Sequence, residues 1–496
     1  MRKRLAVFIP FLASIPLLAD ANETAYKKIE SLQQELQRLQ EQFKETNQLD
    51  IEHEDILDKV ETKSILDKIN FAPQLELRFD KLHYKNNYIE GENTKIPDNP
   101  SYTGNAPAPG TDNRRSGYTK NFDIATTVYF DLMMSAQLDA HTKFHGKLSF
   151  TNTTQSHQRM CILSRDIKAQ HAESAFDVTL AYFDYTPTPN SDYSYTLSMG
   201  ILPTSNGTPM QYAQNAQRTS MFPALVFDMN SYGLIYTQKI KSIYARAVLA
   251  QAYTLRRVFY PYQCNREDID NASIAGIYLD DTVTLFGSQA LLSGGFNALF
   301  AFKAHPYLGP DIYNTNTQVL GNIYTTGIGI DLPKIGQTPL DLFAHAALSI
   351  PDGNGKTQDY KITQYKNGKG LTDGGTPGFT EADYASGEML AKNGYAFYVG
   401  MKYTFNDHFD IGAEYNHGSK YWFGATQGAK NMFNKLALRG NGYELYAHCK
   451  LNAHLYAKFG FLDMHENYTG SGWHFGEPAK KSADQKIGSI SLNAKF

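Results

Sequence analysis

The last eleven residues of the chain, KIGSISLNAKF (486–496), alternate between polar and apolar side chains from Ser489 to the end. In an extended strand, Ile490, Leu492, Ala494 and Phe496 share one face, and the other face is polar. A strand rises about 3.3 Å per residue, so this one could cross a hydrocarbon layer. The pattern favours the closing strand of a transmembrane barrel, although the final strand of a secreted β-sandwich would alternate in the same way.

The amino-terminal end predicts export. Basic residues 2–4 precede an apolar run over residues 5–18, and Ala-Asp-Ala at 19–21 supplies the small residues that a signal peptidase reads. An uncleaved anchor is the alternative, but the run is shorter than the about 20 residues that a spanning helix needs. Pro10 and Pro16 also interrupt it. We therefore expect residues 1–21 to be a signal peptide.

Composition agrees with a barrel in a membrane. The mean hydropathy of −0.43 would suit a soluble protein, but only half of each barrel strand faces lipid, so its hydropathy averages out. The chain has 33 Tyr and 29 Phe but only 2 Trp, with 38 Gly and 20 Pro, which suits strands, tight turns and interfacial aromatic belts. A formal net charge of −3 gives no sign of a nucleic-acid partner.

A different periodicity occupies residues 22–70. Apolar residues recur at alternating steps of three and four in SLQQELQRLQEQF, which is typical of a coiled-coil seam. The seam weakens at Asp50 and His53 and can resume, with a change of phase, from Leu57. We expect a short periplasmic coiled coil, and a three-stranded stalk is the natural guess because porins are commonly trimers. A single amphipathic helix on a partner is the alternative.

From Phe71 to Phe496 the period becomes two, which predicts one all-β domain. Short connections such as 187–192, 239–241, 332–338, 406–408 and 452–453 take turns with long ones. The long ones are 87–120, 152–173, 203–223, 351–392 and 464–485. Bacterial barrels have short periplasmic turns and long external loops, so both chain ends should lie on the periplasmic side and the strand number should be even.

The strand count depends on two segments. Treating 224–238 as one bulged strand and 281–294 as an irregular connection gives an antiparallel barrel of sixteen strands. Splitting 281–294 into further strands gives eighteen. We expect sixteen, because TVTLFGSQALLSGG is apolar without clean alternation.

One resemblance can now be stated. The signal, coiled coil and barrel layout, with SMGILPTSNGTPMQY (198–212) and MFPALVFDMNSYGLIYT (221–237), resembles a family of porin-like outer-membrane proteins of unknown function with an N-terminal coiled coil. The terminal Phe496 is also similar to the signature by which bacterial outer-membrane proteins reach their insertion machinery. The resemblance implies a bacterial outer-membrane location, and it implies no particular substrate.

Strand parity predicts which charged residues face the lumen. Charges there stay hydrated, whereas charges that face lipid are costly, so the polar face of each strand should line a pore. Structural ion pairs between neighbouring strands are the alternative. The predicted inner set is Glu76, Arg78, His145, Lys147, Arg246, Lys402, Glu414, Glu444, His448, Lys458 and Lys495.

The 203–223 segment resembles, in position and length, the third loop that narrows the lumen of many general porins. Its side chains are mostly neutral and polar, and Arg218 is its only charge. A constriction of amides and hydroxyls would pass neutral or polar solutes. An ordinary surface loop is the alternative.

No other chemistry is indicated. Cys161 and Cys264 are expected in surface loops, where they could form a disulfide or stay free thiols. His141 and His145, and separately Asp268, Asp270 and Asn271, are weak candidates for metal ligands, and we predict no metal and no cofactor. No GxSxG motif is present, and we expect no enzyme activity.

These patterns predict a passive channel for small hydrophilic solutes or ions in the outer membrane, with membrane lipid and two further copies of the chain as partners. A surface adhesion or structural barrel plugged by its loops is the second hypothesis. A hydrolase carried by the barrel is the third, because its residues would meet only in the fold.

Overall fold

The computed structural model describes residues 30–31, 33–39, 41, 69–89, 118–121, 124–154, 174–189, 191–252, 272–303, 318–365, 379–426, 434–471 and 474–496. The chain divides into two units, Met1–Lys68 and Ile69–Phe496. The described residues of the first unit, all between 30 and 41, are helical. The signal peptide and most of the predicted coiled coil lie outside the described residues, so both stay predictions. Among the described residues, no helix has the length and hydropathy to cross a membrane.

Most of the described residues of the second unit lie in strands. The first half contains β1 (Ile69–Ile89), β2 (Tyr118–Asn121), β3 (Ala125–Gln137), β4 (Thr142–Thr153), β5 (Ser174–Tyr185), β6 (Tyr193–Leu202), β7 (Ser231–Ile240), β8 (Ile243–Ala252), β9 (Ser273–Leu285) and β10 (Ser288–Lys303). The second half contains β11 (Val319–Leu332), β12 (Leu340–Gly353), β13 (Gln358–Tyr365), β14 (Phe379–Gly387), β15 (Gly394–Asn406), β16 (Phe409–Gly418), β17 (Gly440–Lys450), β18 (Leu455–Tyr468) and β19 (Lys480–Lys495). The helices are α3 (Gln211–Gln214) and the 3-10 turns η2 (Ile335–Gln337) and η4 (Lys435–Ala437).

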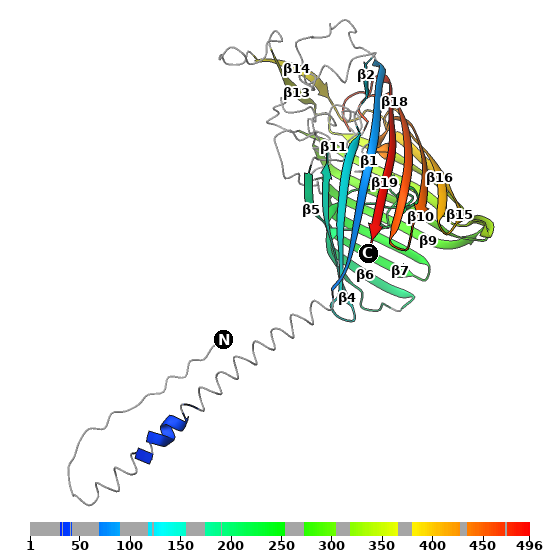
Figure 1. The fold of residues 1–496 in the computed structure, drawn as a ribbon. Helices are drawn as coiled ribbons and strands as arrows, with labels where there is room; N and C mark the ends of the chain where they lie inside the picture. The colour runs from blue at the N-terminus through cyan, green and yellow to red at the C-terminus, as the bar shows by residue number, and fades with distance from the viewer. Residues whose placement is uncertain are drawn as a thin grey trace, which may run out of the picture. The chain divides into compact units, whose positions relative to one another are not determined.

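These strands close into one antiparallel barrel (Figure 1). The first strand pairs with the last, from Gln74 opposite Lys495 to Ile89 opposite Lys481. β2 and β3 both pair with β1 and count as one strand, while β13 and β14 form a separate hairpin. The barrel therefore has sixteen strands, which confirms the predicted number.

Short and long connections alternate around the barrel. The short-turn end, where the C-terminus lies, carries two- to seven-residue turns such as 241–242 and 333–339. The long-loop end carries the longer connections, including the one that holds β13 and β14 (Figure 1). The inference of an even strand number from short turns on one side is thus correct.

The two faces of the wall differ as the alternation predicts. Side chains such as Phe130, Phe183, Phe397 and Phe459 point outward and are exposed. Inward-facing rings lie over glycines on the neighbouring strand. For example, Tyr278 is paired with Gly295, where an added Cβ would come within 2.2 Å of the ring. An apolar outer surface of this kind suits a hydrocarbon layer.

Three details of the predicted strand map are wrong. Residues 281–294 are the two arms of a hairpin, the end of β9 and the start of β10, and not an irregular connection. Residues 224–230 are not part of a strand, since β7 begins only at Ser231. Half of 464–485 is strand, because β18 continues to Tyr468 and β19 begins at Lys480.

Candidate functional site

The candidate site is the interior of the barrel, and the 203–230 loop between β6 and β7 lies inside it. Thr208 Oγ1 donates a hydrogen bond to Asp331 Oδ2 on β11, at 2.5 Å. On β17, four strands further around the barrel, His448 Nε2 lies 3.2 Å from the carbonyl oxygen of Ala213. Lys495 Nζ donates to the carbonyl oxygen of Asn215 at 3.0 Å. The loop therefore crosses the lumen, and the alternative of an ordinary surface loop is wrong.

The local sequence explains why this loop folds inward. Gly207 packs so closely against Phe222 that an added Cβ would come 1.9 Å from the carbonyl oxygen of Phe222. The Asp228 carboxylate accepts hydrogen bonds from the Asn206 amide at 2.5 Å and from the Thr426 hydroxyl at 3.1 Å. Together these contacts close the base of the loop, so its apolar residues can only be buried against the inner wall.

An apolar core fills one side of the lumen. Tyr212 stacks on Phe343 with ring centroids 5.1 Å apart, and Phe222 packs on Tyr278 at 4.3 Å. Leu225, Val226 and other loop residues are fully buried among side chains of β5 to β17. The description of the 203–223 segment as mostly neutral and polar did not predict this core, because the few apolar residues of the segment are the ones that pack on the wall.

A second loop enters from the long-loop end. In the described part of the 419–439 loop, Trp422 is fully buried and donates from Nε1 to the carbonyl oxygen of Leu436 at 2.8 Å. Arg439 Nε donates back to the carbonyl oxygen of Trp422 at 2.9 Å. Leu438 joins Leu82 and neighbouring side chains of β1, β18 and β19 in a second buried cluster. No strand periodicity marks this loop, so strand parity could not find it.

Lys435 of this loop carries a buried charge into the lumen. Its Nζ lies 2.5 Å from Glu414 Oε2 and 2.5 Å from Glu444 Oε2, and its side chain is 2% exposed. Tyr398 donates a hydrogen bond to Glu414 as well. Burial acts to lower the pKa of Lys435, but the two carboxylates outweigh it and raise that pKa above its ordinary value. Glu414 and Glu444 thus hold the loop through one ammonium group.

The remaining predicted residues also lie on the inner face, and most have ionic partners. The shortest of these contacts are Arg246 with Asp280, His448 with Asp410 at 2.6 Å, and Arg78 with Asp80 at 2.9 Å. Longer ones are Lys147 with Asp131 at 3.2 Å, Lys402 with Asp341 at 3.3 Å, His145 with Asp184 at 3.3 Å, Lys458 with Glu444 at 3.8 Å, and Arg218 with Asp280 at 3.9 Å. Glu76 is half-buried on β1. Structural ion pairing, which was the alternative, therefore describes most of the predicted inner residues. The role of these residues in a pore stays a prediction.

The predicted inner set did not include the aspartates that pair with its basic residues. The alternation of faces along the strands could have identified several of them. Asp80 and Asp131 lie in segments predicted as strands, on the same inner faces as Arg78 and Tyr129. Asp280 lies directly before 281–294, which was predicted as an irregular connection. Counting both signs of charge along each strand would have indicated cross-strand pairing.

One part of the inner wall stays accessible. The inner face of β4 presents His145, Lys147, Ser149 and Thr151, all half-buried, and so forms a polar row along the strand. The side chains of His145 and Lys147 are 25% and 24% exposed, and those of Arg218 and Lys402 are 20% and 21%. The inner space is therefore lined by partly exposed polar and charged side chains beside the apolar core.

Two further predictions concern ligands and thiols. Among the described residues, no group of three or more His, Cys, Asp or Glu side chains is placed to hold a metal ion. Asp268, Asp270, Asn271, Cys161 and Cys264 lie outside the described residues. Cys449, on β17, is a free thiol.

Comparison with known proteins gives a family. The model of a family described as a protein of unknown function (DUF3373) matches residues 119–493. No curated protein matches the sequence.

Solved structures give a distant likeness. OprB of Pseudomonas putida is 10% identical, with a TM-score of 0.45, and the match covers 88% of this chain and 96% of that one. OmpF of Salmonella typhi, in complex with daunomycin, is 10% identical, with a TM-score of 0.41 and coverage of 86% and 97%. OmpT of Vibrio cholerae, an outer-membrane protein, is 13% identical, with a TM-score of 0.38 and coverage of 86% and 97%.

Proposed function

Because the chain belongs to the DUF3373 family, whose function is unknown, we propose from the barrel itself that it is a narrow outer-membrane channel for passive diffusion of small hydrophilic solutes or ions. The observation that carries this proposal is the polar row on β4, from His145 to Thr151, which stays accessible beside the inserted 203–230 loop. A wall that had no solute or water to face would gain from apolar packing, as the opposite wall does.

The path would follow this polar row. Arg218 of the loop adds a partly exposed cation to the lumen, 3.9 Å from Asp280 on β9. Charges of both signs along the path would hydrate ions and polar solutes and give weak ion selectivity. No residue has to react with the solute, so the proposal includes no catalytic residue and no cofactor.

Location and assembly are part of the same proposal. An apolar outer surface and short turns at the end where the chain closes fit an outer-membrane barrel with that end in the periplasm. Residues 22–70 would form a periplasmic coiled coil and hold three copies together. Covalent cross-linking of the full chain in native membranes should give a trimer, and a variant lacking residues 22–70 should give less of it.

Conductance tests the channel. Purified, folded full-length protein in a planar bilayer should open in discrete steps of small size. Asn206 accepts hydrogen bonds from the amides of Thr219 and Ser220, at 3.3 Å and 3.4 Å, so a short linker can replace residues 209–218. That variant should conduct more than the wild type. A folded barrel that never conducts would contradict the proposal.

A second candidate is a sealed structural barrel, and one observation favours it. Two loops meet in the lumen, and Lys435 binds two buried carboxylates there. A sealed barrel predicts no conductance from the wild type or from the 209–218 replacement, as long as the 419–439 loop stays in place. The same bilayer experiment therefore separates the two candidates.

A further inference from the structure

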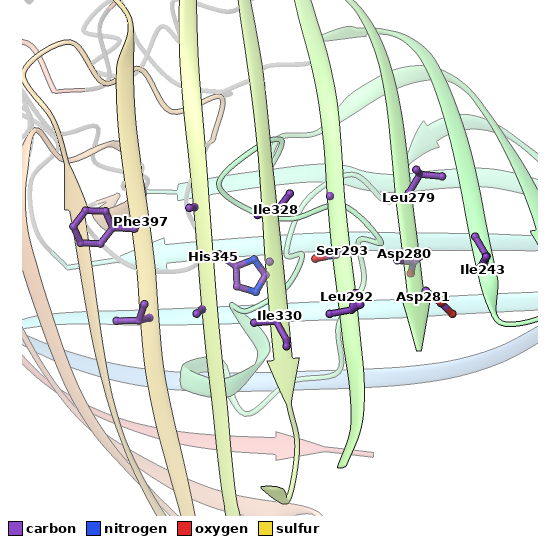
Figure 2. Close-up of a pocket in the computed structure, with 15 residues that line it drawn as sticks. Ile243, Leu279, Asp280, Asp281, Leu292, Ser293, Ile328, Ile330, His345 and Phe397 are labelled. Carbon is purple, nitrogen blue, oxygen red and sulfur yellow. The ribbon is translucent and has the colours of Figure 1, made fainter. Parts of the chain in front are cut away.

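A shallow groove lies on the outer face of the wall, across β8 to β15, with a volume of about 790 Å³. Its sides include Leu279, Ile328 and Phe397, which are exposed (Figure 2). Its floor is formed where the outward residues are small, at Gly294, Ala344 and Ala346. Ordinary binding sites for small molecules measure about 300–1,000 Å³, so the groove is large enough to hold a ligand.

The groove runs obliquely across the wall. Its lining includes one row of cross-strand neighbours: Ile243, Asp281, Leu292, Ile330, Ala344 and Val399. Ile243 is the first residue of β8, at the short-turn end, whereas Val399 lies in the middle of β15. The row therefore begins at the rim of the barrel and ends at mid-height of the wall.

A carboxyl group occupies the rim end of this groove. Asp281 points outward between Ile243 and Leu292 (Figure 2). Its Oδ1 is buried and has no hydrogen-bond partner among the described residues. Lys241, in the turn just before Ile243, is exposed. A carboxylate oxygen without a donor, beside an apolar groove, is unfavourable unless a donor from outside the chain reaches it.

We propose that the groove binds a phospholipid with a primary-amine headgroup from the periplasmic leaflet. The acyl chain would lie along the groove from Leu292 to Phe397, and the ammonium would donate hydrogen bonds to Asp281. The phosphate would then lie within reach of Lys241. This proposal rests on the outer-membrane location proposed above and not on conductance, so either can fail without the other.

The test uses the full-length barrel in nanodiscs of phosphatidylethanolamine, phosphatidylcholine or phosphatidylglycerol, extracted gently for native mass spectrometry. The wild type should keep phosphatidylethanolamine in preference to the other two, because a quaternary ammonium has no N–H and glycerol has no charge. Asp281→Asn should lower the retained phosphatidylethanolamine about tenfold, as loss of a charge-assisted hydrogen bond does. Asp407→Asn, at an exposed turn of the same end, is the matched control and should have no effect.

A second pair of variants tests the groove without changing charge. Ala346→Phe should fill the floor and displace the lipid, whereas Ala447→Phe, outward on β17, should not. Equal retention of all three lipids, or full retention by Asp281→Asn, would overturn the proposal. So would efficient disulfide cross-linking between two Ile328→Cys chains in native membranes, because a second copy would then cover the groove.

Discussion

Asp228 and Thr426 are hydrogen-bonded inside the barrel although 198 residues separate them. Thr426 Oγ1 donates to Asp228 Oδ2, and the amide of Asp228 donates to the carbonyl oxygen of Ala425 at 2.9 Å. Two loops that begin on distant strands, 203–230 and 419–439, therefore form one unit in the lumen. Whatever loosens one of them should loosen the other.

This junction should respond to pH. Burial raises the pKa of Asp228 to about 6 from an ordinary 3.8. A raised carboxyl pKa means that the folded state binds the proton more tightly, so this contribution to stability is full below pH 4 and is lost as pH rises through 6. Thermal unfolding in detergent should show the wild type gaining stability from pH 7 to pH 5 relative to Asp228→Asn. Asp192→Asn, in an exposed turn, should behave as the wild type does.

Lys435 should be needed for the fold of the 419–439 loop. Lys435→Met leaves Glu414 buried without its counter-charge and leaves Glu444 with only Lys458, at 3.8 Å; breaking a buried pair in this way typically costs about 3–5 kcal/mol. Lys420→Met is the control in the same loop, because the Lys420–Glu477 pair is exposed and should contribute less than about 1 kcal/mol. Urea unfolding in detergent measures both. Equal effects of the two variants would show that the buried pair is not what holds the loop.

The contact between Tyr278 and Gly295 should tolerate no side chain at position 295. Gly295→Ala places a Cβ 2.2 Å from the ring, which must move and should cost about 1–3 kcal/mol. Gly488→Ala adds a Cβ that meets nothing within 4 Å, and it serves as the control. The comparison is made by heat denaturation of the folded barrel. A Gly295→Ala barrel as stable as the Gly488→Ala barrel would refute the packing argument.

Arg218 should influence ion preference if the lumen conducts. Arg218→Gln removes the loop cation beside Asp280, so the reversal potential in a salt gradient should move toward cation selectivity. Lys392→Gln changes an exposed lysine in the 354–393 loop and should leave the potential unchanged. No shift for Arg218→Gln in a conducting barrel would place the path away from this residue.

Strand alternation was enough to predict the barrel. Because successive side chains point to opposite faces, the residues from Tyr395 to Phe405 alone indicate which face of their strand is apolar. The order of short and long connections then set the parity of the strand number. The alternation and the order of the connections can both be read from short stretches of sequence, and the structure has both.

The misplaced segments failed for physical reasons. The turn of the 281–294 hairpin is Phe286-Gly287, with φ of 51° and 69°, and a Phe in that conformation is an uncommon turn signal. Residues 224–227 are apolar because they pack in the lumen, and apolarity shows that a segment is buried but not where. Polar residues hid the ends of β18 and β19, where Lys481 and Glu466 pair at 2.6 Å inside the wall.

The alternation in the closing strand at 486–496 predicts that the strand belongs to a barrel wall and which face each of its residues takes. The sequence by itself determined that much, because the two faces of a strand meet different surroundings and their residues differ accordingly. What fills the lumen was decided only in the tertiary structure. The contacts of Lys435 with Glu414 and Glu444, and of Asp228 with Thr426, join segments far apart in the chain, and no local period records such pairs.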